Sequence, residues 1–317
     1  MRIFCICKVL MRMTDERNFR SSYYEKVGFR SVEEKKSLEI LLKDRPFDKG
    51  KLKQFCLRFA VPAIHRNFLW KILLGVIPVY EESHDFVMKQ RKAEFEDIQQ
   101  TLRDAKIFDE LLKPSQMFLM MWVLRNKRPK LDISTQMESQ LFRSMSRMAE
   151  SLWKITIIDQ DHEKLVDMYW VLSGFLDHVQ KFHKDVDRLK ECTCTLLERE
   201  DQDLHNYLHK IGALQTLPYE TWFYSCFAGT ITDGSITKIW DKIAVGAYKI
   251  LVYVLVVKLT TLRRFLLRCE SLQDVLDAIA NITEETSEVI VNKAIELWQQ
   301  SGSISSSQNT ITVVQSS

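Results

Sequence analysis

The sequence predicts an all-α protein without a β-sheet, and two observations carry this prediction. The 317 residues include only 9 Gly and 6 Pro, so few positions interrupt long helices and a turn-rich β fold is disfavoured. Apolar residues also recur at helical spacing, most clearly at Leu272, Val275, Leu276 and Ile279, which occupy positions i, i+3, i+4 and i+7. A hydrophobic content of 46% is enough to bury a full helical core.

The chain begins with a segment that we expect to lie outside the fold. Residues 1–13 contain no acidic residue, and their three basic residues account for the whole net charge of +3. The apolar run in this segment is split by Lys8, and no small-residue cleavage site follows it, which argues against a signal peptide. We therefore interpret residues 1–13 as a disordered upstream extension or as an artefact of the assigned start site.

The first helices are predicted from local start and stop signals. The capping box Ser31-x-x-Glu34 begins a helix, and Arg45-Pro46 ends it. Residues 64–74 carry apolar side chains along one helical face, and Gly75 supplies the stop. Residues 86–108 mix apolar and charged residues in the pattern of a surface helix.

Further helices are predicted through the middle of the chain. One begins at Pro114, because proline suits the first turn of a helix, and it ends at Arg128-Pro129. Residues 144–176 carry helices around several aromatic side chains, and residues 183–214 form a polar, charge-rich helical region.

Residues 218–257 carry the densest set of helix signals. Pro218 suits a first helical turn, Gly229 suits a left-handed cap, and Ser235 suits the N-cap of the following helix. The apolar run 250–257 is far shorter than the roughly 20 residues that a membrane span requires. We therefore expect this run to be a buried core helix.

The last helix is predicted to begin at Thr283, with Glu284 and Glu285 in its first turn, where acidic residues are favourable. After Gly302 no packable pattern remains, so residues 301–317 are expected to form a disordered tail. Residues 14–300 are expected to form the helical domain.

Cysteine and histidine patterns give no support for metal or disulfide chemistry. The seven Cys and seven His residues lack the paired spacing of a zinc site, and we read the cysteines as thiols in a reducing compartment. No basic stripe with interleaved aromatic residues indicates nucleic-acid binding. The sequence therefore predicts no cofactor and no bound metal.

Two stretches resemble the signature motifs of one family. The first is R-x-x-x-W-x-x-L-L-G-x-x-P, which begins at Arg66, and the second lies within residues 218–257. They resemble the opening and closing motifs of TBC domains, all-helical modules that stimulate GTP hydrolysis on Rab GTPases. The resemblance implies a multi-helix TBC fold for residues 14–300, with added helices at both ends. The residues that carry the two motifs are Arg66, Trp70, Trp222, Trp240 and Asp241.

The catalytic part of the family pattern is missing. Active TBC domains present an arginine and a glutamine to the GTPase within I-x-x-D-x-x-R and Y-x-Q. The nearest sequences here are Ile107-x-x-Glu110-x-x-Lys113 and Ile158-x-x-Asp161-x-x-Lys164, and no tyrosine has Gln two positions later. Lysine lacks the bidentate guanidinium fork. We expect no catalytic residue, and we favour structural roles for Arg66 and Trp240-Asp241 over contact with a GTPase.

Residues 17–44 resemble the N-terminus of a TBC-family member that acts as a subunit of the tuberous sclerosis complex. That resemblance implies binding to the coiled coil of hamartin, and through it to tuberin, which activates the GTPase Rheb and so restrains mTOR signalling. It implies a cytoplasmic protein that can reach lysosomal or vesicle surfaces through its complex. The alternatives are an active Rab GTPase-activating protein and a helical adaptor unrelated to GTPases.

One segment is a candidate for the partner surface. Residues 117–124 are apolar on every side of a short helix, with one side rich in methionine. Flexible methionine side chains suit a groove that accepts an apolar helix. Either both sides are buried as core, or the methionine side forms a groove with the preceding helix that binds the hamartin coiled coil. The residues of this candidate groove are Phe95, Ile98, Leu102, Met117, Met120, Met121 and Leu124.

Overall fold

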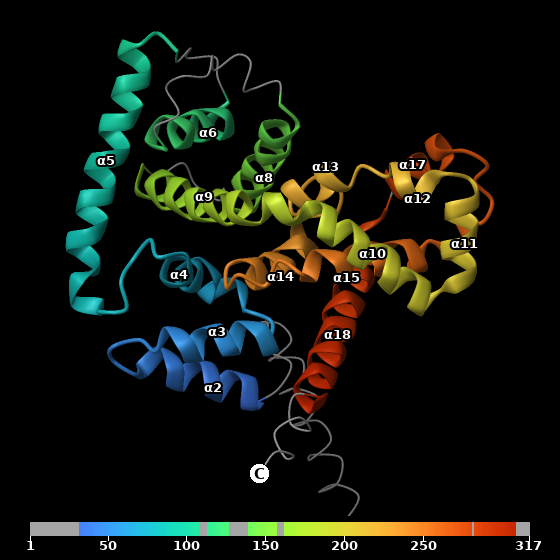
Figure 1. Ribbon diagram of the computed structural model, residues 1–317. Coiled ribbons are helices and arrows are strands. Elements are labelled where there is room, and N and C mark those ends of the chain that lie inside the picture. Colours follow the sequence, from blue (N-terminus) through green and yellow to red (C-terminus); the bar gives the residue numbers. More distant parts are fainter. Residues whose placement is uncertain (1–31, 108–112, 127–138, 157–161, 281, 309–317) are drawn as a thin grey trace, which may run out of the picture. The chain divides into compact units, whose positions relative to one another are not determined.

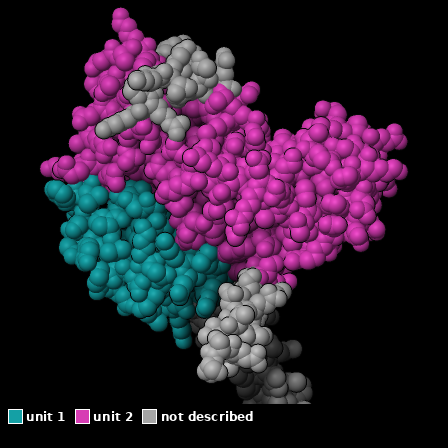
Figure 2. All heavy atoms as spheres, viewed as in Figure 1, with its two compact units in different colours: residues 1–87 teal, residues 88–317 magenta. Residues whose placement is uncertain are grey.

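The predicted all-α class is confirmed in the computed structural model, which describes residues 32–107, 113–126, 139–156, 162–280 and 282–308 (Figure 1). These residues contain no β-strand, only an isolated bridge between Ala228 and Ile231. None of the described helices is both long enough and apolar enough to cross a membrane. The chain divides into two compact units, residues 1–87 and 88–317 (Figure 2).

Within its described residues, 32–87, the first unit contains three α-helices, a short 3₁₀ helix and the start of a further α-helix. These are α2 (Val32–Lys43), α3 (Lys49–Arg58), α4 (Ala63–Leu74), the short 3₁₀ helix η1 (Glu81–Ser83) and the first residues of α5 (His84–Asp104). α3 begins at Asp48, whose carboxylate accepts a hydrogen bond from the Lys51 backbone N–H at 3.0 Å. α4 ends at Gly75, the stop that the sequence predicted, and Gly75 adopts the left-handed conformation. Ser31 of the predicted capping box lies outside the described residues.

The second unit contains the rest of α5 and the later helices that the structure describes. They are α6 (Pro114–Arg125), α8 (Gln140–Thr156), α9 (His162–Phe182), η2 (His183–Asp185), α10 (Val186–Glu200), α11 (Gln202–Lys210), α12 (Ala213–Thr216), α13 (Tyr219–Tyr224), α14 (Asp233–Ile243), α15 (Ile250–Thr261), α16 (Arg263–Leu266), α17 (Leu272–Ala280) and α18 (Glu284–Gln308).

α15 lies at the centre of the second unit, packed against α18, α10 and α14 (Figure 1). Of its twelve residues, nine are buried, so it is apolar on all sides, as the run 250–257 predicted. A helix without a polar face is stable in water only when other helices cover it completely. α10 and α18 supply that cover from distant parts of the chain.

Several helix ends differ from the sequence prediction. α13 ends at Tyr224, so Gly229 does not cap it directly, and α14 begins after Thr232 instead of Ser235. Ser235 lies inside α14, and its hydroxyl donates to Glu284 at 3.1 Å, a partner too distant in sequence to be foreseen. α18 continues beyond Gly302, where the sequence analysis ended it. By contrast, Ser271 and Asp274 form the expected reciprocal cap of α17, at 3.0 and 3.2 Å.

Candidate functional site

The opening motif lies in α4, and its two signature side chains are engaged within the first unit. Arg66 is half-buried, and its guanidinium donates to the Val61 carbonyl, 2.6 Å away. Trp70 is buried in the core of this unit. The Arg66 contact holds the turn that precedes α4, which fits the structural role that the sequence favoured for this arginine.

The closing motif surrounds the indole of Trp240 in the second unit. This side chain is fully buried on α14, its ring centroid lies 5.6 Å from that of Phe175, and its Nε1–H donates to the Cys226 carbonyl at 3.2 Å. Asp241 is also fully buried, and Trp222 on α13 is nearly so. The motif residues of this stretch are therefore part of the core of their unit.

The turn that connects α13 to α14 has an uncommon backbone. Cys226 and Phe227 have positive φ values of 48° and 65°, and Gly229 follows at 72°. Non-glycine residues rarely occupy the left-handed region, and each instance costs on the order of 1–3 kcal/mol. The Trp240 indole, bonded to the Cys226 carbonyl, is one of the contacts that hold this turn in place.

Lys258 reaches the same turn from α15. Its side chain is fully buried, and Nζ donates to the Thr230 carbonyl at 3.1 Å. Burial lowers the pKa of Lys258 to about 7, because the charged ammonium is separated from water. This group was not among the residues that the sequence singled out, although it directly follows the apolar run 250–257. A lone cation inside an otherwise apolar helix was the signal that could have identified it.

The candidate partner groove is largely closed in the structure. Met117, Met120 and Met121 are 5%, 7% and 0% exposed, and they share the core with Phe95 and Leu102. The opposite side of α6 is buried too, since the Trp122 indole donates to Asp177 on α9 at 2.9 Å. This burial favours the first of the two alternatives, in which both sides of α6 are core. Ile98 is half-buried, and Leu124 is 37% exposed.

A cluster of charged and aromatic side chains ties α5, α6 and α9 together. The guanidinium groups of Arg91 and Arg125 lie 4.1 and 4.7 Å from the ring centroid of Trp170. Arg125 also contacts Glu94 at 3.2 Å and donates to the Ser173 hydroxyl at 3.1 Å. These cation–π contacts and the ion pair hold both arginine side chains against the neighbouring helices. This cluster could not be predicted from sequence spacing, because its members come from three separate helices.

The segments closest to the family's catalytic motifs are only partly described. Glu110, Ile158 and Asp161 lie outside the described residues, whereas Lys113 and Lys164 are exposed. Among the residues that the structure does describe, no group of three or more His, Cys, Asp or Glu side chains could hold a metal ion. No disulfide joins the five cysteines within these residues, and of them only Cys192 is exposed.

Comparison with known proteins agrees with the two motifs. Residues 64–267 match the family model of the Rab-GTPase-TBC domain. TBC1 domain family member 7 of Bos taurus is 37% identical over 293 residues, which cover 92% of this chain and 97% of that protein. TBC1 domain family member 7 of Homo sapiens is 36% identical, with the same coverage of both chains.

Solved structures show the same fold at low sequence identity. The Ypt/Rab-GAP domain of Gyp1p superposes with a TM-score of 0.57 at 16% identity, covering 85% of this chain and 98% of that one. The Chlamydomonas flagellar RabGAP TBC domain superposes with a TM-score of 0.55, also at 16% identity, covering 90% and 94%. With the motifs, the family match over residues 64–267 and relatives similar over nearly their whole length, the chain belongs to the Rab-GAP TBC domain family.

Proposed function

We propose that this protein is a non-catalytic TBC-domain subunit that binds the coiled coil of hamartin and supports the tuberous sclerosis complex. In this role it promotes the activation of Rheb by tuberin and restrains mTOR signalling. The observation that carries the proposal is that the sequence contains neither I-x-x-D-x-x-R nor Y-x-Q. A member of a GTPase-activating family that lacks both motifs can still bind protein partners, but it lacks the arginine and glutamine that accelerate GTP hydrolysis.

The missing arginine is the stronger part of this argument. An arginine finger stabilises charge on the transferred phosphate and is worth roughly 10³–10⁵ in rate. Lys113 and Lys164 stand at the corresponding places of the two nearest sequences, and a lysine ammonium cannot form the bidentate contact of a guanidinium. Arg66, the arginine of the opening motif, is engaged with the Val61 carbonyl.

Similarity to TBC1 domain family member 7 from two vertebrates supports the choice of complex. The similarity extends over 92% of the chain, so it includes sequence on both sides of the matched TBC region, residues 64–267. We take residues 14–300 as the binding domain. The proposed place of action is the cytoplasm, at lysosomal or vesicle surfaces that the complex reaches.

For the partner surface we propose the open edge of the α5–α6 face. Leu124 and Ile98 are partly exposed, so an apolar stripe of a coiled coil can cover them, whereas Met117, Met120 and Met121 are buried. The test is a pull-down of the hamartin coiled coil with Leu124→Asp, with Val289→Asp as the control. Val289 is an aliphatic residue of α18 with a similar exposure of 43%.

The expected result is weaker capture by Leu124→Asp and normal capture by Val289→Asp, with both variants folded. Equal capture by both variants would place the binding surface elsewhere.

A second experiment tests whether the protein activates a GTPase. On a panel of Rab GTPases, the wild-type protein should not accelerate GTP hydrolysis. If the protein accelerates GTP hydrolysis on any Rab and Arg66→Ala abolishes this effect, the alternative of an active Rab GTPase-activating protein is established.

A further inference from the structure

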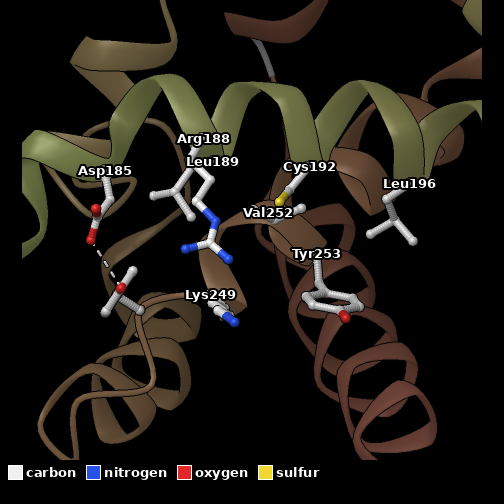
Figure 3. A pocket seen from close by; sticks show the side chains of 9 residues that line it. Asp185, Arg188, Leu189, Cys192, Leu196, Lys249, Val252 and Tyr253 are labelled. Carbon is white, nitrogen blue, oxygen red and sulfur yellow. Dashed lines mark hydrogen bonds between the residues drawn. The ribbon is translucent and has the colours of Figure 1, made fainter. Parts of the chain in front are cut away.

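A pocket of about 220 Å³ lies between α10 and the start of α15, within the second unit (Figure 3). One wall is a single face of the helix η2–α10, where Asp185, Arg188, Leu189, Cys192 and Leu196 follow one another at helical spacing. The other wall comes from Tyr248 through Tyr253. The side chains of this second wall lie within the closing-motif stretch 218–257, whereas those of the α10 wall lie in neither motif.

The floor of the pocket is apolar and its rim is cationic. Leu189, Leu196 and Val252 are 3%, 8% and 4% exposed and form a closed hydrophobic base. Arg188 and Lys249 are exposed, and their charged ends reach into the same opening from opposite walls (Figure 3). Neither side chain forms an ion pair or a hydrogen bond with any described residue.

The one carboxylate of the pocket is already engaged. Asp185 accepts a hydrogen bond from the Tyr248 hydroxyl at 3.0 Å, and the Tyr248 ring stacks on Phe182 with centroids 5.0 Å apart. Burial, together with this bond to Asp185, raises the pKa of Tyr248, so its hydroxyl stays protonated and continues to donate at neutral pH. With Asp185 held in this way, the lining carries two cations against one anion, and the unmatched charge faces solvent.

Size and charge together select the ligand. Pockets that bind small molecules usually enclose about 300–1,000 Å³, so this one is small for a cofactor or a nucleotide but large enough for one side chain of a partner. Two unpaired cations that share an opening repel each other, and an anion placed between them relieves that repulsion. A glutamate also has methylene groups that the floor of Leu189 and Val252 can cover.

We propose that the α10–α15 pocket binds an acidic side chain, a glutamate in particular, presented by a segment of a partner protein. The carboxylate lies between Arg188 and Lys249, and the aliphatic stem packs on the apolar floor. This binding site is independent of the α5–α6 face and of the hamartin proposal, and it would serve whichever acidic partner segment reaches it.

The test measures binding of a fluorescent peptide of alternating Glu and Leu to the full-length protein, beside the same peptide with Gln in place of Glu. Variant Arg188→Ala/Lys249→Ala removes both rim cations. Variant Arg264→Ala/Arg268→Ala removes two exposed cations that do not line the pocket, and so makes the same change in net charge. Thermal melting verifies that both variants, altered only at exposed positions, remain folded.

We expect the Glu peptide to bind in a salt-dependent manner and the Gln peptide to bind weakly or not at all. The rim variant should lose roughly tenfold in affinity, as two partly exposed ion pairs would supply, and the control variant less than about twofold. Equal binding to the rim variant and the wild type overturns the proposal, as does equal binding of the two peptides. If inorganic phosphate binds but the Glu peptide does not, the pocket is an anion site of another kind and the proposal is wrong.

Discussion

A fully buried lysine without an acidic partner is costly, and among the described residues Lys258 on α15 has no such partner. Its ammonium donates to the Thr230 carbonyl, in the turn where Cys226 and Phe227 take left-handed conformations. Unfolded, the side chain keeps a pKa near 10.5, whereas folded it has a pKa of about 7. The difference makes the stability of the protein depend on pH.

Between pH 7 and pH 10.5 the unfolded chain carries a proton on Lys258 that the folded chain has released. The free energy of unfolding should therefore rise with pH, by up to about 1.4 kcal/mol per unit from this group, and the buried-charge penalty is fully present below pH 7. Denaturant unfolding from pH 7 to 8.5, before tyrosines titrate, measures the slope. Lys258→Met should remove this contribution, and an unchanged slope in that variant would show that another group is responsible.

A second residue-scale prediction concerns the indole of Trp240. Trp240→Phe keeps a buried aromatic ring but leaves the Cys226 carbonyl without its donor, which should cost about 1–3 kcal/mol of unfolding free energy. Trp298→Phe makes the same change of ring at a half-buried position, where the indole forms no hydrogen bond within the described residues. If the two variants lose the same free energy of unfolding, the smaller ring, and not the missing hydrogen bond, accounts for the loss.

At the scale of elements, helix positions were more predictable than side-chain surroundings. Local signals placed α17, whose cap Ser271 and Asp274 lie three residues apart, and the Gly75 end of α4. They failed at the start of α14, because Ser235 bonds to Glu284 on another helix instead of capping its own. They also could not show that both sides of α6 are buried, since that depends on helices elsewhere in the chain.

The burial of α6 gives a prediction of its own. Met121→Asp should prevent stable folding, because Met121 is 0% exposed and an unpaired carboxylate there is strongly unfavourable. Leu124→Asp, three residues away on the same side and 37% exposed, should fold normally. Circular dichroism and thermal melting separate the two outcomes. A folded, cooperative Met121→Asp variant would reopen the possibility that the methionine side is an open groove.

At the scale of the whole molecule, the family and the fold class were predictable, because the two motifs occur in the order and at the spacing typical of TBC domains. The division into units was not, since its boundary between Val87 and Met88 falls inside the continuous helix α5, where no glycine, proline or change of composition marks it. The α10–α15 pocket was missed for a similar reason. Its two walls are separated in sequence: one belongs to the polar, charge-rich region 183–214, and the other to the start of the apolar helix α15.

The extent of the domain is the prediction at this scale. Removing residues 1–13 and 302–317 should leave the melting temperature within a few degrees of the full chain, because neither segment carries a periodic apolar face. Differential scanning calorimetry of the trimmed and full-length proteins makes the comparison. A fall of many degrees after trimming either end would show that the removed residues contribute to the fold.

The exposed thiol of Cys192 makes the protein suitable for selective chemical labelling. Cys56, Cys226 and Cys269 are buried and Cys194 is half-buried, and burial raises the pKa of the Cys226 and Cys269 thiols, which lowers their reactivity further. The remaining cysteines, Cys5 and Cys7, are absent once residues 1–13 are removed. A maleimide dye or a photocrosslinker would then attach mainly at Cys192. Because that residue lines the α10–α15 pocket, the attached group would report on, or capture, whatever enters it.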